Sequence, residues 1–139
     1  MFYLGASRAA DEILAQQRTN TRDDPKTIKM LHKLVELTKV LRGELLANNV
    51  LALGDILKTA WMYKRELSAG ITNERVDHYF ELAIRNGALG GKLLGAGGSG
   101  FLLLYVPAEN HERLRLALVD LKEYPFRFDN IGSTIIYYE

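Results

Sequence analysis

Two short apolar runs separated by a glycine-rich loop dominate the stretch GKLLGAGGSGFLLLYV, which extends from Gly91 to Val106. Four of the six residues from Gly95 to Gly100 are glycine, which lets a backbone turn through positive φ or approach a ligand closely. The flanking runs predict two strands. Because tight hairpins close with one or two glycines, four glycines favour a loop that faces a ligand over a purely structural turn.

The residues directly after the glycines exclude two well-known nucleotide-binding loops. Gly95, Gly97 and Gly100 satisfy the dinucleotide pattern G-x-G-x-x-G, but that pattern needs a helix after the loop to receive the pyrophosphate. Here the strand-like run FLLLYV comes next. A P-loop needs Lys and then Ser or Thr directly after its last glycine, whereas Phe101 and Leu102 stand there. The loop therefore belongs to neither class.

Hydrophobic periodicity and chain breakers predict the remaining elements. The helices are expected at residues 7–17, from 26 to about 46, at about 53–61, at 73–86 with Gly87 as C-cap, and at 107–121. The strands are expected at residues 1–5, 92–95 and 101–106, with two more in 125–139 on either side of a turn at 129–132. Residues 18–25 are predicted to form a loop.

The predicted order is strand, helices, strand, strand, helix, strand. This order indicates an α+β fold, a ferredoxin-like split βαβ sandwich with an antiparallel sheet and extra helices in the first crossover. An antiparallel sheet with one solvated face should alternate polar and apolar residues, but FLLLYV does not. We therefore expect its second face to be covered, either by the extra helices or by a domain outside this chain.

Composition narrows the class of protein. At 139 residues the chain suits a single domain, and its net charge of +1 gives no basic footprint for nucleic acid. The absence of cysteine excludes disulfides and thiolate metal sites, and no apolar run reaches the length of a membrane span. The three histidines lie on three different predicted helices, so no metal site is expected. These features predict a cytoplasmic domain that does not bind membranes.

The segment GGKLLGAGGSGFLLLYV closely resembles the third conserved motif of the GHMP kinases. With FYLGASRAADEILAQQ ahead of it, the chain is most similar to the heptose 7-phosphate kinase branch, and the L-fucokinase branch is the nearest alternative. The resemblance implies an ATP- and Mg²⁺-dependent sugar kinase that phosphorylates the anomeric hydroxyl of D-glycero-D-manno-heptose 7-phosphate. It also implies which residues lie beside the nucleotide phosphates and the substrate: Gly95, Ala96, Gly97, Gly98, Ser99 and Gly100. Ser99 departs from the motif, which most often has another glycine there.

The resemblance further implies that part of the enzyme lies elsewhere. The family's nucleotide-clamping motif, Pro-x-x-x-Gly-Leu-Gly-Ser-Ser, does not occur in this sequence. Residues 1–139 are therefore expected to be a GHMP kinase C-terminal domain whose N-terminal ATP-binding domain is absent, with no catalytic residue of its own and no activity alone. The expected partners are ATP, a small-molecule sugar phosphate and the N-terminal domain. Whether the chain also forms a homodimer is left open.

Two alternatives remain open from the residues themselves. Arg8, after the Gly5 turn, suits a substrate phosphate through a bidentate guanidinium, but a solvated arginine in a first helical turn fits equally well. A non-catalytic ferredoxin-like module for small-molecule binding or protein interaction is the second function class. For a kinase, we expect Gly97→Val to reduce turnover far more than stability, because backbone at this loop would approach phosphate closely.

Overall fold

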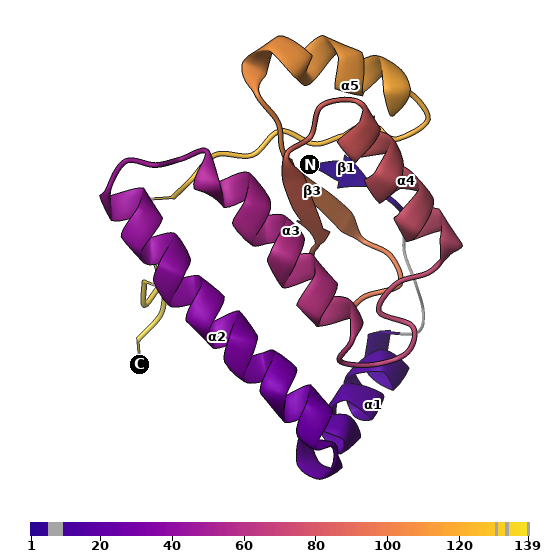
Figure 1. The fold of residues 1–139 in the computed structure, drawn as a ribbon, viewed down its shortest axis with the longest axis vertical. Coiled ribbons are helices and arrows are strands. Elements are labelled where there is room, and N and C mark those ends of the chain that lie inside the picture. The colour runs from indigo at the N-terminus through magenta and orange to yellow at the C-terminus, as the bar shows by residue number, and fades with distance from the viewer. Residues whose placement is uncertain (6–9, 130, 133, 139) are drawn as a thin grey trace.

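Four short strands form one antiparallel sheet in the computed structural model, which describes residues 1–5, 10–129, 131–132 and 134–138 (Figure 1). The strands are β1 (Phe2–Tyr3), β2 (Gly90–Leu93), β3 (Phe101–Tyr105) and β4 (Lys122–Glu123). The helices are α1 (Ala10–Asp23), α2 (Pro25–Leu46), α3 (Ala52–Arg65), α4 (Glu74–Arg85) and α5 (His111–Ala117), with a 3-10 turn, η1, at Ala108–Asn110.

The sheet confirms the predicted ferredoxin-like arrangement. Its spatial order is β2-β3-β1-β4, and every neighbouring pair is antiparallel. Phe2 of β1 lies opposite Leu102 of β3, so the first strand sits beside the third. This is the order of a split βαβ fold, in which a strand is inserted between two strands that a crossover joins. Helices α1 to α4 form the extended first crossover, and α5 forms the second.

The helices are arranged around this sheet in a way that positions α3 centrally. In Figure 1, α2 lies alongside α3, which it packs against, while α4 and α5 lie on the other side of α3. The end of α1 packs against α2. None of the described helices combines the length and the apolar composition needed to cross a membrane.

The apolar core joins the helices to the sheet. Leu102 of β3 is fully buried, and Trp61 of α3 packs against Phe80 of α4 with ring centroids 6.2 Å apart. α3 lies close to β2 because two glycines meet there, and a Cβ on Gly90 would collide with the carbonyl oxygen of Gly54. This close approach brings the last turn of α3 to the end of β2, where the glycine loop begins.

The second face of β3 is covered only in part. Phe101 and Tyr105 are half-buried. The start of α3 lies against Tyr105, whereas Phe101 contacts two other aromatic rings, Tyr3 at 5.1 Å and Tyr124 at 5.3 Å between centroids. The cover predicted for this face thus comes from α3 at one end and from an aromatic cluster at the other.

The loop predicted at residues 18–25 is wrong, because α1 continues to Asp23. The hydroxyl groups of Thr19 and Thr21 donate to carbonyl groups one turn earlier, and Asn20 Nδ2 donates to the Leu67 carbonyl oxygen at 2.8 Å. This last bond ties the end of α1 to the chain that follows α3. A tertiary contact therefore overrides the weak helix propensity of these polar residues.

The strands predicted within residues 125–139 are also wrong. The fourth strand lies earlier, at Lys122–Glu123, and the described residues after Pro125 form no helix or strand. Pro125 has no backbone N–H to donate to a neighbouring strand. High β-propensity, as in Ile135 and Ile136, produces a strand only where a neighbouring strand pairs with it. The helix predicted at 107–121 is shorter than expected, with η1 replacing its first turn and α5 ending at Ala117.

Candidate functional site

The glycine loop connects β2 directly to β3 at one end of the sheet, which confirms the predicted strand–loop–strand arrangement. Its base is closed by a hydrogen bond from the Leu94 N–H to the Phe101 carbonyl oxygen at 2.8 Å. On the α3 side, Lys64 Nζ donates to the carbonyl oxygens of Leu93 and Gly95, at 3.3 and 2.5 Å. The first half of the loop is therefore anchored to α3.

The second half of the loop is anchored to two other segments. The Gly98 N–H donates to the Ile71 carbonyl oxygen at 2.9 Å, and Asn73 Nδ2 donates to the Gly98 carbonyl oxygen at 2.6 Å. Both partners lie in the connection between α3 and α4. Beside β1, the Gly100 N–H donates to the Gly5 carbonyl oxygen at 3.0 Å. The loop shape is thus set by contacts with three distant parts of the chain.

The backbone of the loop requires glycine at four positions. The φ angles lie in the left-handed region: +91° at Gly95, +133° at Gly97, +72° at Gly98 and +111° at Gly100. Other residues adopt such angles only at a cost. Asn48 is the only described non-glycine residue with a positive φ, so Ser99 does not need one. The departure of Ser99 from the motif therefore causes no such strain.

Gly95 and Gly97 face different surroundings. A Cβ on Gly97 would lie 2.6 Å from the Ile71 Cα and 2.9 Å from its carbonyl oxygen, so this glycine packs against buried backbone. A Cβ on Gly95 would meet no described atom within 4 Å, and Gly95 is exposed. This contrast changes the expectation for Gly97→Val, which should lower stability as well as turnover. Gly95 has open space beside it for a ligand.

Several backbone donors of the loop are available to a ligand. Four loop residues have an N–H group that donates to no acceptor in the part of the chain that the structure describes: Gly95, Ala96, Gly97 and Ser99. Neighbouring backbone N–H groups in a glycine-rich turn can form a concave site for an anion. The loop therefore offers donors of the kind that bind phosphate oxygens.

Two lysines place positive charge at this end of the sheet. Burial, and to a smaller degree the neighbouring Lys92 ammonium, lowers the pKa of Lys64 from 10.5 to about 8. Lys64 is therefore still mostly protonated at pH 7. The sequence predicts that Lys92 is a surface or strand-face lysine, and no sequence signal identifies Lys64 as part of a site. A lysine in the last turn of a helix is typical of an exposed residue that complements the helix dipole.

The remaining candidates are the substrate-binding residue Arg8 and a metal site. Arg8 lies outside the described residues, so its relation to the loop stays a prediction. Among the described residues, no three His, Cys, Asp or Glu side chains are grouped so that they could hold a metal ion. The polar groups that the structure brings together here are thus the loop backbone, Lys64, Lys92 and Asn73.

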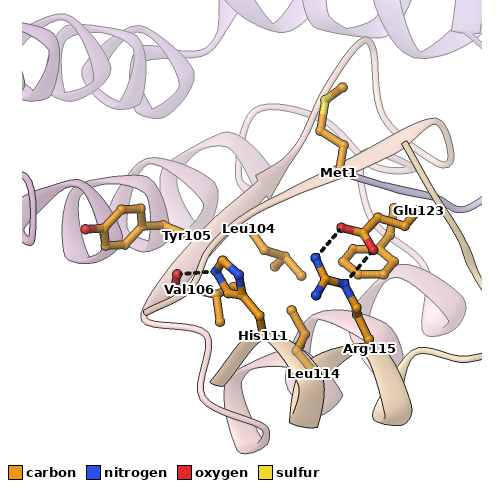
Figure 2. A pocket seen from close by; sticks show the side chains of 9 residues that line it. Met1, Leu104, Tyr105, Val106, His111, Leu114, Arg115 and Glu123 are labelled. Carbon is orange, nitrogen blue, oxygen red and sulfur yellow. Dashed lines mark hydrogen bonds and ion pairs between the residues drawn. The ribbon is translucent and has the colours of Figure 1, made fainter. Parts of the chain in front are cut away.

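A separate cavity of about 220 Å³ lies at the opposite end of β3 (Figure 2). Its charged side chains are already paired: Arg115 donates to Glu123 at 2.9 Å and to Glu112 at 2.6 Å. His111 Nε2 lies 3.0 Å from the Val106 carbonyl oxygen. A ligand pocket needs a few polar groups aimed at its occupant, and these groups are engaged with one another. We therefore place the candidate site at the glycine loop.

Two curated proteins are similar to most of this chain. The bifunctional fucokinase/GDP-fucose pyrophosphorylase of Arabidopsis thaliana is 35% identical over 130 residues, covering 92% of this chain and 12% of that protein. The D-glycero-alpha-D-manno-heptose 7-phosphate kinase of Campylobacter jejuni subsp. jejuni is 26% identical over 118 residues, covering 85% of this chain and 34% of that protein. The chain thus corresponds to a minor part of the length of both relatives.

A solved structure and a family model agree with these similarities. Mevalonate kinase of L. major, in complex with R-mevalonate, shares the fold with a TM-score of 0.71 and 17% identity, over 86% of this chain and 38% of that one. The family model described as GHMP kinases C terminal matches residues 41–124, which include α3, α4, the glycine loop and α5. On this match, and with the predicted fold confirmed, the chain belongs to the GHMP kinase C-terminal domain family.

Proposed function

We propose that this chain is the substrate and phosphate-loop domain of an ATP-dependent sugar kinase. The observation that carries the proposal is the group of loop N–H donors without a described acceptor, beside Lys64 and Lys92. Phosphoryl transfer spreads negative charge over phosphate oxygens, and fixed N–H donors and nearby cations stabilise that charge. The similarity to two kinases that act on sugars supports the same function.

The rest of the active site is proposed to come from an N-terminal kinase domain outside these residues. Phosphoryl transfer needs groups that position the nucleotide, the acceptor hydroxyl and Mg²⁺ from several sides. No described acidic cluster fits a metal ion, so we assign no Mg²⁺ ligand to the described residues. The ligands are proposed to come from the ATP phosphates and the N-terminal domain.

For the acceptor we propose D-glycero-D-manno-heptose 7-phosphate, phosphorylated at its anomeric hydroxyl. The similarity to a heptose 7-phosphate kinase supports this choice, and the positive charge of Lys64 and Lys92 suits a substrate that itself carries a phosphate. L-fucose is the second candidate, because the bifunctional fucokinase is 35% identical over 92% of the chain. The two sugars differ in charge, which makes them distinguishable by substitution of a cation.

The test is ATP consumption by the complete protein that contains this chain, with each sugar in turn. We expect turnover with heptose 7-phosphate that falls at least about tenfold in Gly95→Val, because the added side chain would occupy the space beside the free N–H groups. Arg8→Ala is expected to raise KM for heptose 7-phosphate. If the enzyme uses L-fucose and not the heptose, the acceptor is reassigned and Arg8→Ala should leave KM unchanged.

Gly43→Ala is the matched control. Gly43 lies in α2, where an added Cβ would meet no described atom within 4 Å and the backbone needs no positive φ. This variant should therefore keep full turnover. Thermal midpoints of both variants separate loss of function from loss of fold. Full turnover in a folded Gly95→Val protein would contradict the phosphate role of the loop.

A further inference from the structure

Two side chains from outside the loop hold two of its carbonyl groups. Lys64 Nζ donates to the Gly95 carbonyl oxygen at 2.5 Å, and Asn73 Nδ2 donates to the Gly98 carbonyl oxygen at 2.6 Å. Asn73 is itself fixed, because its Oδ1 accepts from the Val76 N–H at 3.0 Å as the N-cap of α4. Each loop carbonyl is therefore held by a side chain whose own position is set by a helix.

Holding a carbonyl also orients the N–H group of the next residue. In a trans peptide the C=O of one residue and the N–H of the following residue share a plane and point in opposite directions. The described peptide bonds are all trans. The Ala96 N–H is therefore turned away from Lys64, and the Ser99 N–H is turned away from Asn73. Both belong to the loop N–H groups that have no described acceptor.

We propose that Lys64 and Asn73 are positioning residues that orient the Ala96 and Ser99 N–H groups toward a bound phosphate. The inference rests on the proposed phosphate role of the loop and names the residues that shape its donors. Donors that are oriented before binding do not lose conformational freedom when the anion arrives, so they bind it more tightly. Lys64 also contributes charge, whereas neutral Asn73 contributes orientation alone.

The experiment uses the 139-residue chain, with sulfate as the probe because its charge does not change over the pH range of interest. Residual dipolar couplings report the direction of the Ala96 and Ser99 N–H bonds without ligand, and a sulfate titration gives affinity. Lys64→Met removes the first donor. Asn73→Ser removes the second but keeps a residue that can cap α4.

We expect each variant to disturb its own N–H group. Lys64→Met should change the Ala96 coupling and lower sulfate affinity roughly tenfold, the effect of losing a charge-assisted contact. Asn73→Ser should change the Ser99 coupling and lower the affinity roughly threefold, as for a neutral hydrogen bond. Because Asn73→Ser alters no charge, its effect cannot come from electrostatic attraction alone.

Lys58→Met is the control, because it removes the same charge from another position of the same helix. Unchanged couplings in both variants would overturn the proposal. Equal loss of affinity in Lys58→Met and Lys64→Met, with the Ala96 coupling unchanged, would also overturn it by assigning the effect to charge. If the unmodified chain binds no sulfate while the couplings still change in the variants, the positioning role stands and the phosphate role of the loop fails.

Discussion

At the scale of single residues, two glycines of the loop have different surroundings: one has open space beside it, and the other contacts the core. Gly95 is exposed, whereas Gly97, two residues later, lies against the backbone of the fully buried Ile71. Lys64 combines both situations, because its side chain is partly buried and its Nζ donates to the loop carbonyl of Gly95. Substitutions at these three positions should therefore have separable effects on stability and on anion binding.

Gly97→Ala is expected to lower the free energy of unfolding by about 2–4 kcal/mol, because the Ile71 backbone must shift and alanine is unfavourable at positive φ. Gly95→Ala should lower it by about 1–2 kcal/mol, from the backbone angle alone. Urea unfolding followed by the fluorescence of Trp61, the single tryptophan of the chain, measures both values. Equal losses at the two positions would contradict the different surroundings described for them.

Sulfate affinity is expected to fall as the pH rises through about 8, because Lys64 then loses its proton and its charge. The cause of the lowered pKa is burial first and the Lys92 ammonium second. Lys92→Met should therefore move the fall to higher pH, and Lys64→Met should abolish it. A titration of the chain with sulfate at several pH values measures this. A fall that persists unchanged in Lys64→Met would assign it to another group.

At the scale of helices and strands, periodicity predicted where most elements lie but not where several of them end. The end of α4 was predictable from Gly87, which follows the C-cap residue Asn86 and takes a φ of +97° that favours glycine. The last turns of α1 were not, because they depend on the bond from Asn20 to Leu67, which no local pattern encodes. The same holds for the site: the loop glycines are visible in the sequence, whereas Lys64 and Asn73 reach the loop only through tertiary packing.

The start of α2 provides a test of helix capping. The Asp24 carboxylate accepts hydrogen bonds from the Thr27 hydroxyl and from the N–H groups of Lys26 and Thr27. Asp24→Ala should therefore lower the thermal midpoint by roughly 2–6 °C at pH 7.

These hydrogen bonds, the one from the Thr27 hydroxyl first, lower the pKa of Asp24. A lowered carboxyl pKa means stabilisation that is present above about pH 4 and is lost as the pH falls through the lowered value. The lower of two test values, pH 2.5, lies about one and a half units below the pKa of an unfolded aspartate. Thermal scans should therefore show a smaller effect of Asp24→Ala at pH 2.5 than at pH 7. Asp24→Asn keeps one acceptor oxygen in place of the two that the carboxylate uses, so its thermal midpoint at pH 7 should fall between those of Asp24→Ala and the unsubstituted protein.

The C-terminal tail after Pro125 is expected to contribute little to the stability of this domain. Ile136 is 95% exposed, so Ile136→Ser should leave the thermal midpoint within about 2 °C of the unsubstituted protein. Trp61→Ala, by contrast, removes a fully buried side chain and should cost about 3–5 kcal/mol. Circular dichroism during heating compares the two variants. A large loss in Ile136→Ser would show that the tail packs on the domain.

At the scale of the whole molecule, one apolar core joins the helices to the sheet that carries the glycine loop. We expect the 139-residue chain to fold alone, to bind sulfate weakly, and to show no ATP consumption with heptose 7-phosphate. Adding the N-terminal part of the protein as a separate chain should restore turnover. A coupled assay with purified chains measures both outcomes. Turnover by this chain alone that depends on Gly95 would show that residues of this chain itself supply the rest of the active site.

The pairing of β1 with β3 has a consequence for the order of events during synthesis. The Leu4 N–H donates to the Gly100 carbonyl oxygen, and the Gly100 N–H donates to the Gly5 carbonyl oxygen, so the glycine loop is completed by residues from the two ends of a long stretch of chain. Helices α1 to α4 are synthesised before β3, whereas pairings between distant segments form late and slowly. A nascent chain that stops before Phe101 therefore carries α1 to α4 without the completed glycine loop, and the loop takes its final shape only when β3 pairs with β1.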